Sequence, residues 1–362
     1  MHRREFLTTL AGAASAFAAA DSGSGKPIPI GLNTYCLRAL KWRDMELIDY
    51  TAGLKLDAIF LQDSLDPEVM EPAHWSKVRD YARSKGLERL ETGGGAILPK
   101  TPDGFDAVVK TLEQNIVRAK GLGSPIVRCL LAGDRASMPK GSVEQNMDMA
   151  VRILRAVRTR AMDSGVKVAI ENHKDVQAFE TRRVIETAGK EFVGSYLDTG
   201  NPVFVLEDPM TTVEELGPYA VCVHLRDSVI YEHPRGVAVQ WVPLGEGVVD
   251  FKKIVAKVRE VSPPVYIYIK PITGRPPAVL PYLEDSFWTP NTTARARDLV
   301  RFIALAKKGR PYELPMVIED LPGRKAPEAF VPAIQYQQKE HMERSVEYAK
   351  KVLGLGVRWR AA

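Results

Sequence analysis

The stretch KVAIENHKD, residues 167–175, joins an apolar run to a cluster of polar side chains. Its first part, Val168 to Ile170, is typical of a strand in a buried sheet, whereas Glu171 to Asp175 contain no apolar residue. A buried strand can end in such a cluster where its carboxyl end meets a pocket, as in parallel α/β barrels. The stretch therefore predicts an α/β fold with a polar site at the carboxyl ends of its strands.

Seven other short apolar runs resemble this strand, and longer segments with helical periodicity separate them. The eight runs span residues 28–36, 57–62, 87–92, 125–131, 167–171, 193–198, 220–225 and 265–270. Eight strands that alternate with helices predict a (β/α)8 TIM barrel. The alternative is a doubly wound open sheet, which usually has a glycine-rich phosphate loop after its first strand. IGLNT, residues 30–34, is not such a loop.

Local signals support the helices between these runs. Thr101 and Pro102 are typical of a helix start, and apolar residues then recur on one helical face as far as Ile116. Ser142 and Gln145 have the spacing of a capping box. We therefore expect one helix to begin near residue 102 and another near residue 142.

The last ninety or so residues contain a loop and two helical patterns. Residues 272–291 are rich in proline and aromatic side chains and predict a long loop, which is a candidate lid. Residues 294–308 and 332–353 have helical periodicity. We expect the barrel to span residues 27–310 and a helical C-terminal extension, residues 311–362, to pack on it.

The composition is that of a globular protein of 362 residues, with 45% hydrophobic residues, 26% charged residues and a net charge of +5. This length is within the range of one barrel with insertions. No long basic run is interleaved with aromatic residues, so a nucleic-acid partner is not expected. The three cysteines, Cys36, Cys129 and Cys222, are odd in number and widely spaced, which favours buried free thiols over disulfides.

The first twenty residues, MHRREFLTTLAGAASAFAAA, resemble a secretory signal of the twin-arginine kind. Arg3 and Arg4 precede an apolar stretch that ends in small residues, and cleavage is expected after Ala20. No cysteine follows for a lipid anchor, and no later apolar stretch approaches the roughly 20 residues that span a bilayer. The sequence thus predicts a periplasmic or secreted protein without a membrane anchor. An ordinary disordered start is the alternative.

Polar residues end or follow each of the eight predicted strands. They are Asn33; Gln62 and Asp63; Glu91; Arg128; Glu171, Asn172 and His173; Asp198 and Asn201; His224, Arg226 and Asp227; and Lys270. Because the carboxyl ends of barrel strands meet at one face, these side chains are expected to surround a single site.

Three of these strand ends carry motifs that together resemble the xylose isomerase-like TIM barrels. The motifs are IENH at residues 170–173, LDTGNP at 197–202 and HLRD at 224–227, and PLGEGVVDF follows at 243–251. This superfamily includes sugar isomerases and epimerases, inosose dehydratases and apurinic-site endonucleases. The endonucleases place imidazoles where this chain has Gln62 and Glu91, which argues against DNA repair.

In the family, a Glu, an Asp, a His and a second Glu from strands five to eight hold one divalent metal ion. The resemblance implies, by position, that Glu171, Asp198 and His224 are metal ligands here. Mixed carboxylate and imidazole ligands suit Mn²⁺, with Zn²⁺, Co²⁺ or Fe²⁺ as alternatives. Taken singly, each residue has an equally good structural explanation: Glu171 as an ion-pair partner, Asp198 as a turn residue and His224 as a core histidine with satisfied hydrogen bonds.

Lys270 stands where the family has its second Glu, and a protonated lysine cannot bind a metal. In the family's epimerases, the two Glu residues are also the acid and the base across the substrate. Three outcomes are open: a metal with three protein ligands and an open position, a catalytic Lys270, or a site that has lost its metal and only binds sugar. Glu284 or Asp285 would be the candidate ligand if the strand-eight position were shifted.

The resemblance implies an exported sugar isomerase or epimerase that forms a metal-stabilised enediolate, with Glu171 as base and Lys270 or a water returning the proton. Export argues for an unphosphorylated sugar or keto-sugar. A lyase or dehydratase that eliminates a group from a keto-sugar or 3-keto-glycoside is the first alternative, and a non-catalytic sugar-binding protein is the second. The small carbohydrate is the expected partner, and a homo-oligomer is left open. Expected substrate contacts are His173, Asn201, Arg226, Asp227, Arg128 and Glu91.

Overall fold

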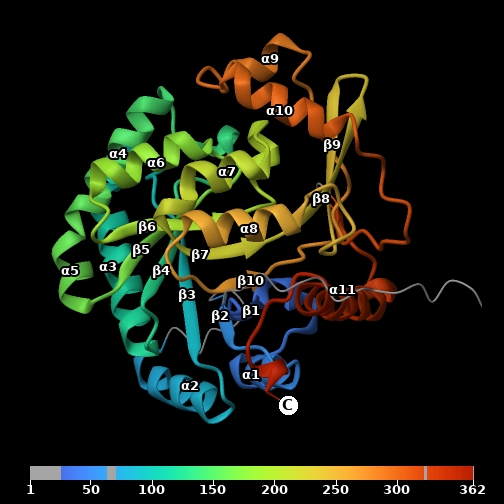
Figure 1. Cartoon of the computed structure of the whole chain (residues 1–362). Helices are drawn as coiled ribbons and strands as arrows, with labels where there is room; N and C mark the ends of the chain where they lie inside the picture. The colour runs from blue at the N-terminus through green and yellow to red at the C-terminus, as the bar shows by residue number, and fades with distance from the viewer. Residues whose placement is uncertain (1–25, 63–70, 322–323, 362) are drawn as a thin grey trace, which may run out of the picture.

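The computed structural model describes residues 26–62, 71–321 and 324–361, and the predicted signal segment lies outside them. At its centre is a closed barrel of eight parallel strands, in the order β1, β10, β7, β6, β5, β4, β3 and β2 around the ring (Figure 1). The barrel strands are β1 (Ile30–Asn33), β2 (Ala58–Leu61), β3 (Arg89–Ala96), β4 (Ile126–Leu130), β5 (Lys167–Glu171), β6 (Val193–Asp198), β7 (Ala220–Leu225) and β10 (Ile267–Ile269). Each overlaps a run predicted as a strand, so the predicted TIM barrel is confirmed and the open sheet is excluded.

Helices cover the outside of the barrel strands (Figure 1). The α-helices are α1 (Asp44–Gly53), α2 (Pro72–Ser84), α3 (Phe105–Leu122), α4 (Val143–Ala156), α5 (Arg158–Ser164), α6 (Ala178–Ala188), α7 (Pro209–Leu216), α8 (Phe251–Val261), α9 (Asp285–Trp288), α10 (Ala296–Ala306) and α11 (Val331–Lys351). Short 3-10 helices are η1 (Thr34–Leu40), η3 (Pro102–Gly104), η4 (Arg135–Ser137), η5 (Pro202–Val205), η6 (Gly217–Tyr219), η7 (Glu328–Phe330) and η8 (Arg358–Arg360).

The two predicted helix starts are confirmed. A turn of 3-10 helix begins at Pro102 and leads into α3, which ends where Gly123 takes a left-handed conformation with φ of 74°. At the start of α4, the Ser142 hydroxyl accepts a hydrogen bond from the backbone N–H of Gln145 at 3.2 Å, and the Gln145 side chain bonds back to the Ser142 N–H. The capping box of Ser142 and Gln145 therefore fixes the start of α4 locally, as the sequence indicates, whereas Thr101 makes no side-chain capping bond at the start of η3.

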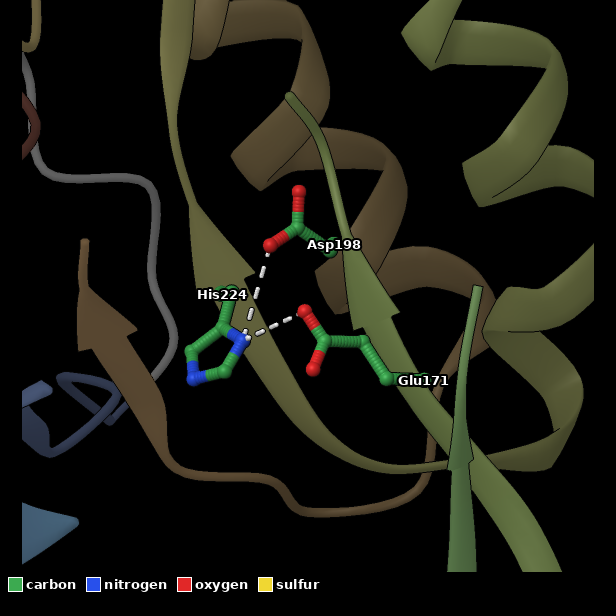
Figure 2. Close-up of side chains that lie close together, drawn as sticks. All are labelled: Glu171, Asp198 and His224. Atoms are coloured by element: carbon green, nitrogen blue, oxygen red, sulfur yellow. Dashed lines mark ion pairs between the residues drawn. The ribbon is translucent and has the colours of Figure 1, made fainter. Parts of the chain in front are cut away.

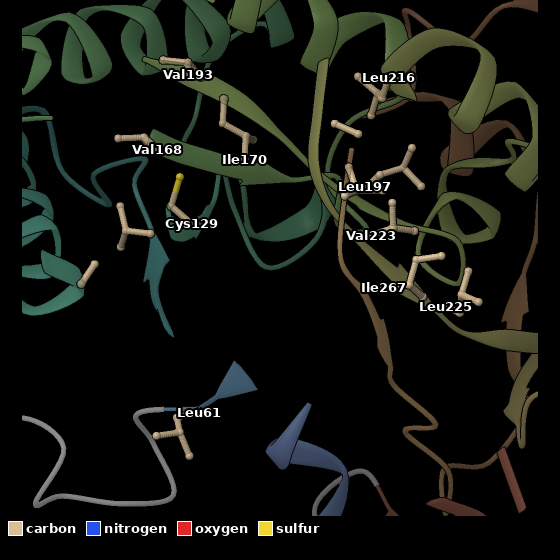
Figure 3. Packing of buried hydrophobic residues seen from close by; sticks show 14 of the residues in the cluster. Leu61, Cys129, Val168, Ile170, Val193, Leu197, Leu216, Val223, Leu225 and Ile267 are labelled. Carbon is tan, nitrogen blue, oxygen red and sulfur yellow. The ribbon is translucent and has the colours of Figure 1, made fainter. Parts of the chain in front are cut away.

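Side chains on the two faces of the barrel strands form separate apolar layers, because neighbouring residues of a strand point to opposite faces. The outer layer is aliphatic and packs against the helices, as Val168, Leu197 and Val223 do in Figure 3. The inner layer is smaller and partly aromatic, and it consists of Ala58, Phe60, Ile126, Ala169, Tyr196, Cys222 and Tyr268. Two positions beyond inner-layer residues, four strands carry or lead into polar side chains, which are Glu171, Asp198, His224 and Lys270.

A hairpin interrupts the alternating pattern after β7. In it, β8 (Asp227–His233) and β9 (Gly236–Val242) pair antiparallel, and β11 (Ala278–Leu280) joins the other edge of β9. Helix α10 packs against β8, and Ile230 and Phe302 meet there in a second apolar cluster. The segment 272–291, predicted as one loop, therefore contains β11 and the short helix α9.

The C-terminal segment shares the apolar core of the barrel. Helix α11 packs against η1 and β10, and Met342, Val346 and Leu355 belong to the main apolar cluster. A two-residue strand pair, β12 (Asp320–Leu321) with β13 (Arg324–Lys325), precedes α11. The division predicted at residue 310 thus separates two segments that form one core.

Two expectations from composition concern cysteines and membranes. Cys36, Cys129 and Cys222 are free and buried, as predicted. Among the residues that the structure describes, no helix has both the length and the apolar character needed to cross a membrane.

Asp57 joins the start of β2 to the first strand and to the C-terminal tail. Its carboxylate is buried and accepts backbone N–H bonds from Ile30 at 2.8 Å, Val357 at 3.0 Å and Arg358 at 2.8 Å. These bonds connect three segments that are far apart in the sequence. The carboxylate therefore fixes the tail against the amino-terminal end of the barrel.

We expect Asp57→Ala to lower the free energy of unfolding by about 2 kcal/mol or more, because the buried N–H of Ile30 and the partly buried N–H groups of Val357 and Arg358 lose their partner, and an unpaired buried N–H costs about 1–3 kcal/mol. Urea unfolding followed by circular dichroism measures the change. Asp103→Ala, at an exposed acid in η3, is the matched control. Equal stability of the two variants would contradict the role assigned to Asp57.

Candidate active site

Four neighbouring strands bring four polar side chains together at the carboxyl end of the barrel. Glu171 ends β5, Asp198 ends β6, His224 lies near the end of β7 and Lys270 follows β10. The strand register places Asp198 beside His224, and the Lys270 N–H bonds to the carbonyl of Leu225 on β7 at 3.0 Å. The barrel therefore converts four separate strand ends into one cluster.

Glu171, Asp198 and His224 point toward one another, as Figure 2 shows. The Nδ1 atom of His224 lies 3.5 Å from Oε1 of Glu171 and 3.5 Å from Oδ2 of Asp198. One donor atom from each residue lies within 4.8 Å of the other two, and all three side chains are buried. By donor type and spacing, this triad could hold a divalent metal ion.

Lys270 enters the same space. Its Nζ lies 2.5 Å from Oε1 of Glu171, 3.1 Å from Oδ2 of Asp198 and 3.3 Å from Nδ1 of His224. The lysine is 6% exposed, so its ammonium group is almost entirely enclosed by these partners. The ammonium thus lies between the three atoms that would bind a metal. In this position, the side chain does not fit with a bound ion.

Asn33 decides which nitrogen of His224 carries the proton. The Asn33 Oδ1 accepts the backbone N–H of Tyr35 at 3.0 Å, so its amide nitrogen is the group that faces Nε2 of His224, at 3.2 Å. An amide nitrogen can only donate, and therefore Nε2 accepts. In a neutral imidazole, the proton then lies on Nδ1, which faces the two carboxylates.

A net of amide and backbone bonds holds the two carboxylates in place. Oδ1 of Asp198 accepts the backbone N–H groups of Gly200 at 2.8 Å and Asn201 at 3.0 Å. The Asn201 amide donates to Oε1 of Glu171 at 3.2 Å. The Asn172 side chain bonds both the N–H and the carbonyl of Asp198. The motifs IENH and LDTGNP therefore support each other across two strands.

Two arginines add positive charge around the cluster. Nε of Arg128 lies 3.4 Å from Oε2 of Glu171, and Nη1 of Arg226 lies 3.5 Å from Oδ2 of Asp198. The Arg226 guanidinium also stacks over the ring of Trp241 at 3.7 Å. A side chain at Gly200 would collide with Arg226, because its Cβ would lie 2.5 Å from that of the arginine.

These contacts set the charge state of the two acids. Burial alone would raise the pKa of Glu171, but Lys270 and Arg128 outweigh burial and hold that pKa well below its usual range. In the same way, burial opposes the charged form of Asp198, while Lys270 and Arg226 hold its pKa low. Both carboxylates are therefore ionised at neutral pH.

Three of the predicted substrate contacts surround the cluster, and three others bind protein groups. Arg128, Asn201 and Arg226 contact Glu171 or Asp198, as described above. His173 instead turns to the carbonyl of Gly133, and burial lowers its pKa to about 4.

Glu91 and Asp227, two further predicted substrate contacts, bind groups of the protein itself. Glu91 lies inside the barrel, where Arg89 Nε is 2.5 Å from one oxygen and the Tyr196 hydroxyl is 3.2 Å from the other. Asp227 is buried and accepts the backbone N–H groups of Gly245 at 2.9 Å and Gly247 at 3.0 Å. We therefore assign Glu91 to the barrel interior and Asp227 to the loop that carries PLGEGVVDF.

Sequence reasoning gave no role to two residues of the site, namely Asn33 and Asn172, and it left Trp241 between sugar stacking and packing. Asn33 and Asn172 do end predicted strands, but a polar residue at a strand end carries no sign of its partner. Trp241 lies in the hairpin that the strand pattern missed, and its indole N–H donates to the Gly200 carbonyl at 2.9 Å. Two runs rich in β-branched and aromatic residues, 229–231 and 237–242, flank the turn-forming HPRG at 233–236, and they were the signal that could have revealed this hairpin.

Comparison with known proteins agrees with this architecture. The family model of the xylose isomerase-like TIM barrel matches residues 48–269. An uncharacterised protein, YihM of Escherichia coli strain K12, is 24% identical over 115 residues, which are 32% of this chain. Those residues span only about a third (35%) of the length of YihM.

Solved structures with the same fold include an epimerase and a dehydratase. A D-psicose 3-epimerase, crystallised in the presence of D-fructose, superposes with a TM-score of 0.60 at 16% identity, covering 90% of this chain and 100% of the epimerase. The probable 3-DHS dehydratase AsbF of Bacillus anthracis has a TM-score of 0.54 at 15% identity, covering 67% of this chain and 92% of that protein. At these identities, the likeness shows the fold alone.

Asp175, which ends the polar stretch after β5, supports the loop beside the cluster. Its buried carboxylate accepts the N–H groups of Ala132 at 2.7 Å and Val176 at 2.8 Å, and burial raises its pKa from 3.8 to about 6. Because the folded state favours the neutral acid, the stabilisation is complete below about pH 4 and is lost as the pH rises through 6.

We therefore expect Asp175→Asn to gain stability relative to the wild type between about pH 4 and pH 6, on the order of 3 kcal/mol, since one pKa unit corresponds to about 1.4 kcal/mol. Urea unfolding at several pH values from 4 to 7 measures this difference. Asp163→Asn, on the exposed face of α5, is the control and should follow the wild-type curve. A constant difference across this range would refute the role of burial at Asp175.

Proposed function

Because this chain belongs to the xylose isomerase-like TIM barrel family, we propose that it is an isomerase or epimerase of an unphosphorylated sugar or keto-sugar, acting through an enediolate. The observation that carries this proposal is the contact between Glu171 and Lys270. A carboxylate and an ammonium group lie 2.5 Å apart at the carboxyl end of the barrel, where enzymes of this fold hold their catalytic residues. The pair supplies a base and an acid side by side.

Glu171 is the base that removes the proton next to the substrate carbonyl. In the resting site, its low pKa makes it a weak base, because Lys270 and Arg128 stabilise the carboxylate. A substrate oxygen that accepts a hydrogen bond from Lys270 draws the ammonium away from Glu171, and this change strengthens the base. The same ammonium then stabilises the negative oxygen of the enediolate.

Return of the proton completes the reaction, and Lys270 or a water molecule supplies it. Delivery to the same carbon from the opposite face gives an epimer, whereas delivery to the neighbouring carbon gives an isomer. Nε and Nη2 of Arg226 are buried and have no hydrogen-bond partner among the described residues. We propose that these N–H groups bind hydroxyl groups of the sugar.

Elimination is the alternative, and one observation favours it. The Lys270 ammonium is an acid directly beside the base, so it could protonate an oxygen that leaves from the carbon next to the enediolate. The products would then be an unsaturated keto-sugar and water or an alcohol. A keto-sugar or a 3-keto-glycoside would be the substrate of such a lyase.

The sequence predicts a divalent ion, Mn²⁺ first, which could bind only if the Lys270 side chain left the cluster. Its ligands would be Glu171, Asp198 and His224, and it would stabilise the enediolate as a Lewis acid. None of the proton transfers described above requires this ion.

Glu171→Gln should lower the rate of proton exchange at the substrate carbon by at least about 100-fold, since a general base contributes about 100- to 10 000-fold. Proton NMR in D₂O, with free ketohexoses and 3-keto-glycosides, measures the exchange. Glu180→Gln is the control, because Glu180 is equally buried and pairs with Arg135 at 3.0 Å. Exchange without loss of a group supports an epimerase or isomerase, and release of alcohol or water supports the lyase.

A non-catalytic sugar-binding protein would behave differently in the same experiment. It would bind one of these sugars, as calorimetry would show, without exchanging a proton of that sugar. Binding would also survive Glu171→Gln. This combination would refute both catalytic proposals.

We further propose that the protein is exported, on the basis of residues 1–20. Replacing both Arg3 and Arg4 by lysine should keep the chain in the cytoplasm, because the twin-arginine signal is read as a pair of arginines. Cell fractionation and the mass of the mature chain measure the outcome. The control is Arg43→Lys with Lys26→Arg, outside the signal. Unchanged export of the Arg3/Arg4 variant would contradict the twin-arginine route.

A further inference from the structure

We infer that the ammonium group of Lys270 takes the place of the divalent metal ion in this chain, so that the site works with a cation that is part of the protein. This inference concerns the charge at the centre of the site and holds whichever reaction the site catalyses. It rests on three observations, which are the space that Lys270 occupies, the charge around it and the orientation of His224.

The ammonium group and a metal ion would occupy the same space. Nζ of Lys270 lies 2.5 Å from Oε1 of Glu171 and 3.1 Å from Oδ2 of Asp198, two of the atoms that would bind the ion. A transition-metal ion binds carboxylate oxygens at about 2.0–2.2 Å. An ion at that distance from both oxygens would contact Nζ directly. The ion could enter only if the Lys270 side chain left the cluster.

The charge of the cluster is already compensated without a metal. Two buried carboxylates face three positive side chains, since Arg128 and Arg226 accompany Lys270. A divalent ion would add two positive charges to a site whose positive groups already outnumber its negative ones. Buried like charges repel strongly because little water screens them. The two arginines therefore repel a divalent ion, with its two positive charges, more strongly than they repel the single positive charge of the Lys270 ammonium.

His224 presents the wrong atom to a metal. A metal binds the unprotonated nitrogen of a neutral imidazole. Asn33 donates to Nε2, so the nitrogen that faces the carboxylates, Nδ1, carries the proton. Nδ1 lies 3.5 Å from the nearest oxygens of Glu171 and Asp198 and 3.3 Å from Nζ of Lys270. An ammonium group has no lone pair, so the imidazole N–H and the ammonium are both donors beside the same two carboxylates.

The replacement changes what the site can do. A metal ion accepts electron pairs from oxygen and has no proton to give, whereas an ammonium group donates hydrogen bonds and can release a proton to a neighbouring oxygen. A chelator can remove a bound metal ion, but it cannot remove the ammonium group of Lys270. The site should therefore keep its structure and its charge in the absence of any divalent ion.

The test is to measure metal binding in the mature protein and in Lys270→Glu, which restores the carboxylate at this position. Each protein is stripped with a chelator, incubated with Mn²⁺ or Co²⁺, dialysed and analysed for metal per chain. We expect no stoichiometric metal in the wild type and about one ion per Lys270→Glu chain. Mutation of a residue that only hydrogen-bonds to a metal ligand lowers metal affinity about 10- to 100-fold. Replacing the blocking lysine by a residue that itself binds the metal should therefore raise the affinity by more than about 100-fold.

Two further variants keep the result interpretable. Lys174→Glu makes the same substitution at a neighbouring lysine whose Nζ lies over the Phe204 ring, at 5.5 Å, and it should bind no ion. Lys270→Gln removes the ammonium and keeps an uncharged polar side chain at this position. If circular dichroism shows that Lys270→Glu does not fold, Lys270→Gln is tested in its place. Because it also lacks the ammonium, Lys270→Gln should bind metal too.

Two results would overturn the inference. The first is about one metal ion per wild-type chain that is lost in His224→Ala. The second is a folded Lys270→Glu and a folded Lys270→Gln that both bind no more metal than the wild type does. Since metal per chain is measured without any substrate, neither result depends on the reaction proposed above.

Discussion

The ion pair between Lys270 and the carboxylates of Glu171 and Asp198 is the contact on which the rest of the site depends. Two ionised acids are buried almost side by side, and such a pair is unstable without positive charge at the same depth. The ammonium group supplies this charge from the end of a neighbouring strand. Removal of either acid would increase the excess of buried positive charge, and removal of Lys270 would leave Glu171 and Asp198 with only the arginines at 3.4 and 3.5 Å.

The barrel makes this arrangement rigid by fixing the groups around it. Asn201 and the backbone after Asp198 hold the two acids, and Trp241 stacks on Arg226 from the hairpin that follows β7. Inside the barrel, Tyr196 packs against the His224 ring at a centroid distance of 4.3 Å. A site held in this way needs little rearrangement when charge develops on a substrate oxygen, as in the enediolate mechanism that we propose.

Local patterns were sufficient for most of the fold. The eight barrel strands overlap the predicted runs because parallel strands buried on both faces are continuous apolar segments. Strand β11 was missed because its pairing joins residues far apart in the sequence, such as Val239 and Ala278. A short strand of this kind owes its conformation to the distant strand beside it, and no nearby residue signals that partner. The hairpin β8–β9, in contrast, joins neighbouring segments and has a local signal.

The sequence by itself determined the barrel, the family and the identity of the polar residues at the carboxyl ends of the strands, since each depends on residue types at fixed spacing along the chain. Only the tertiary structure decided which atom lies at the centre of the site and which nitrogen of His224 carries the proton. Lys270 reaches Glu171 across 99 residues and Asn33 reaches His224 across 191, and contacts at such separations form only when the barrel closes. It is this closure that brings the ammonium of Lys270 among three side chains, Glu171, Asp198 and His224, whose spacing could hold a metal.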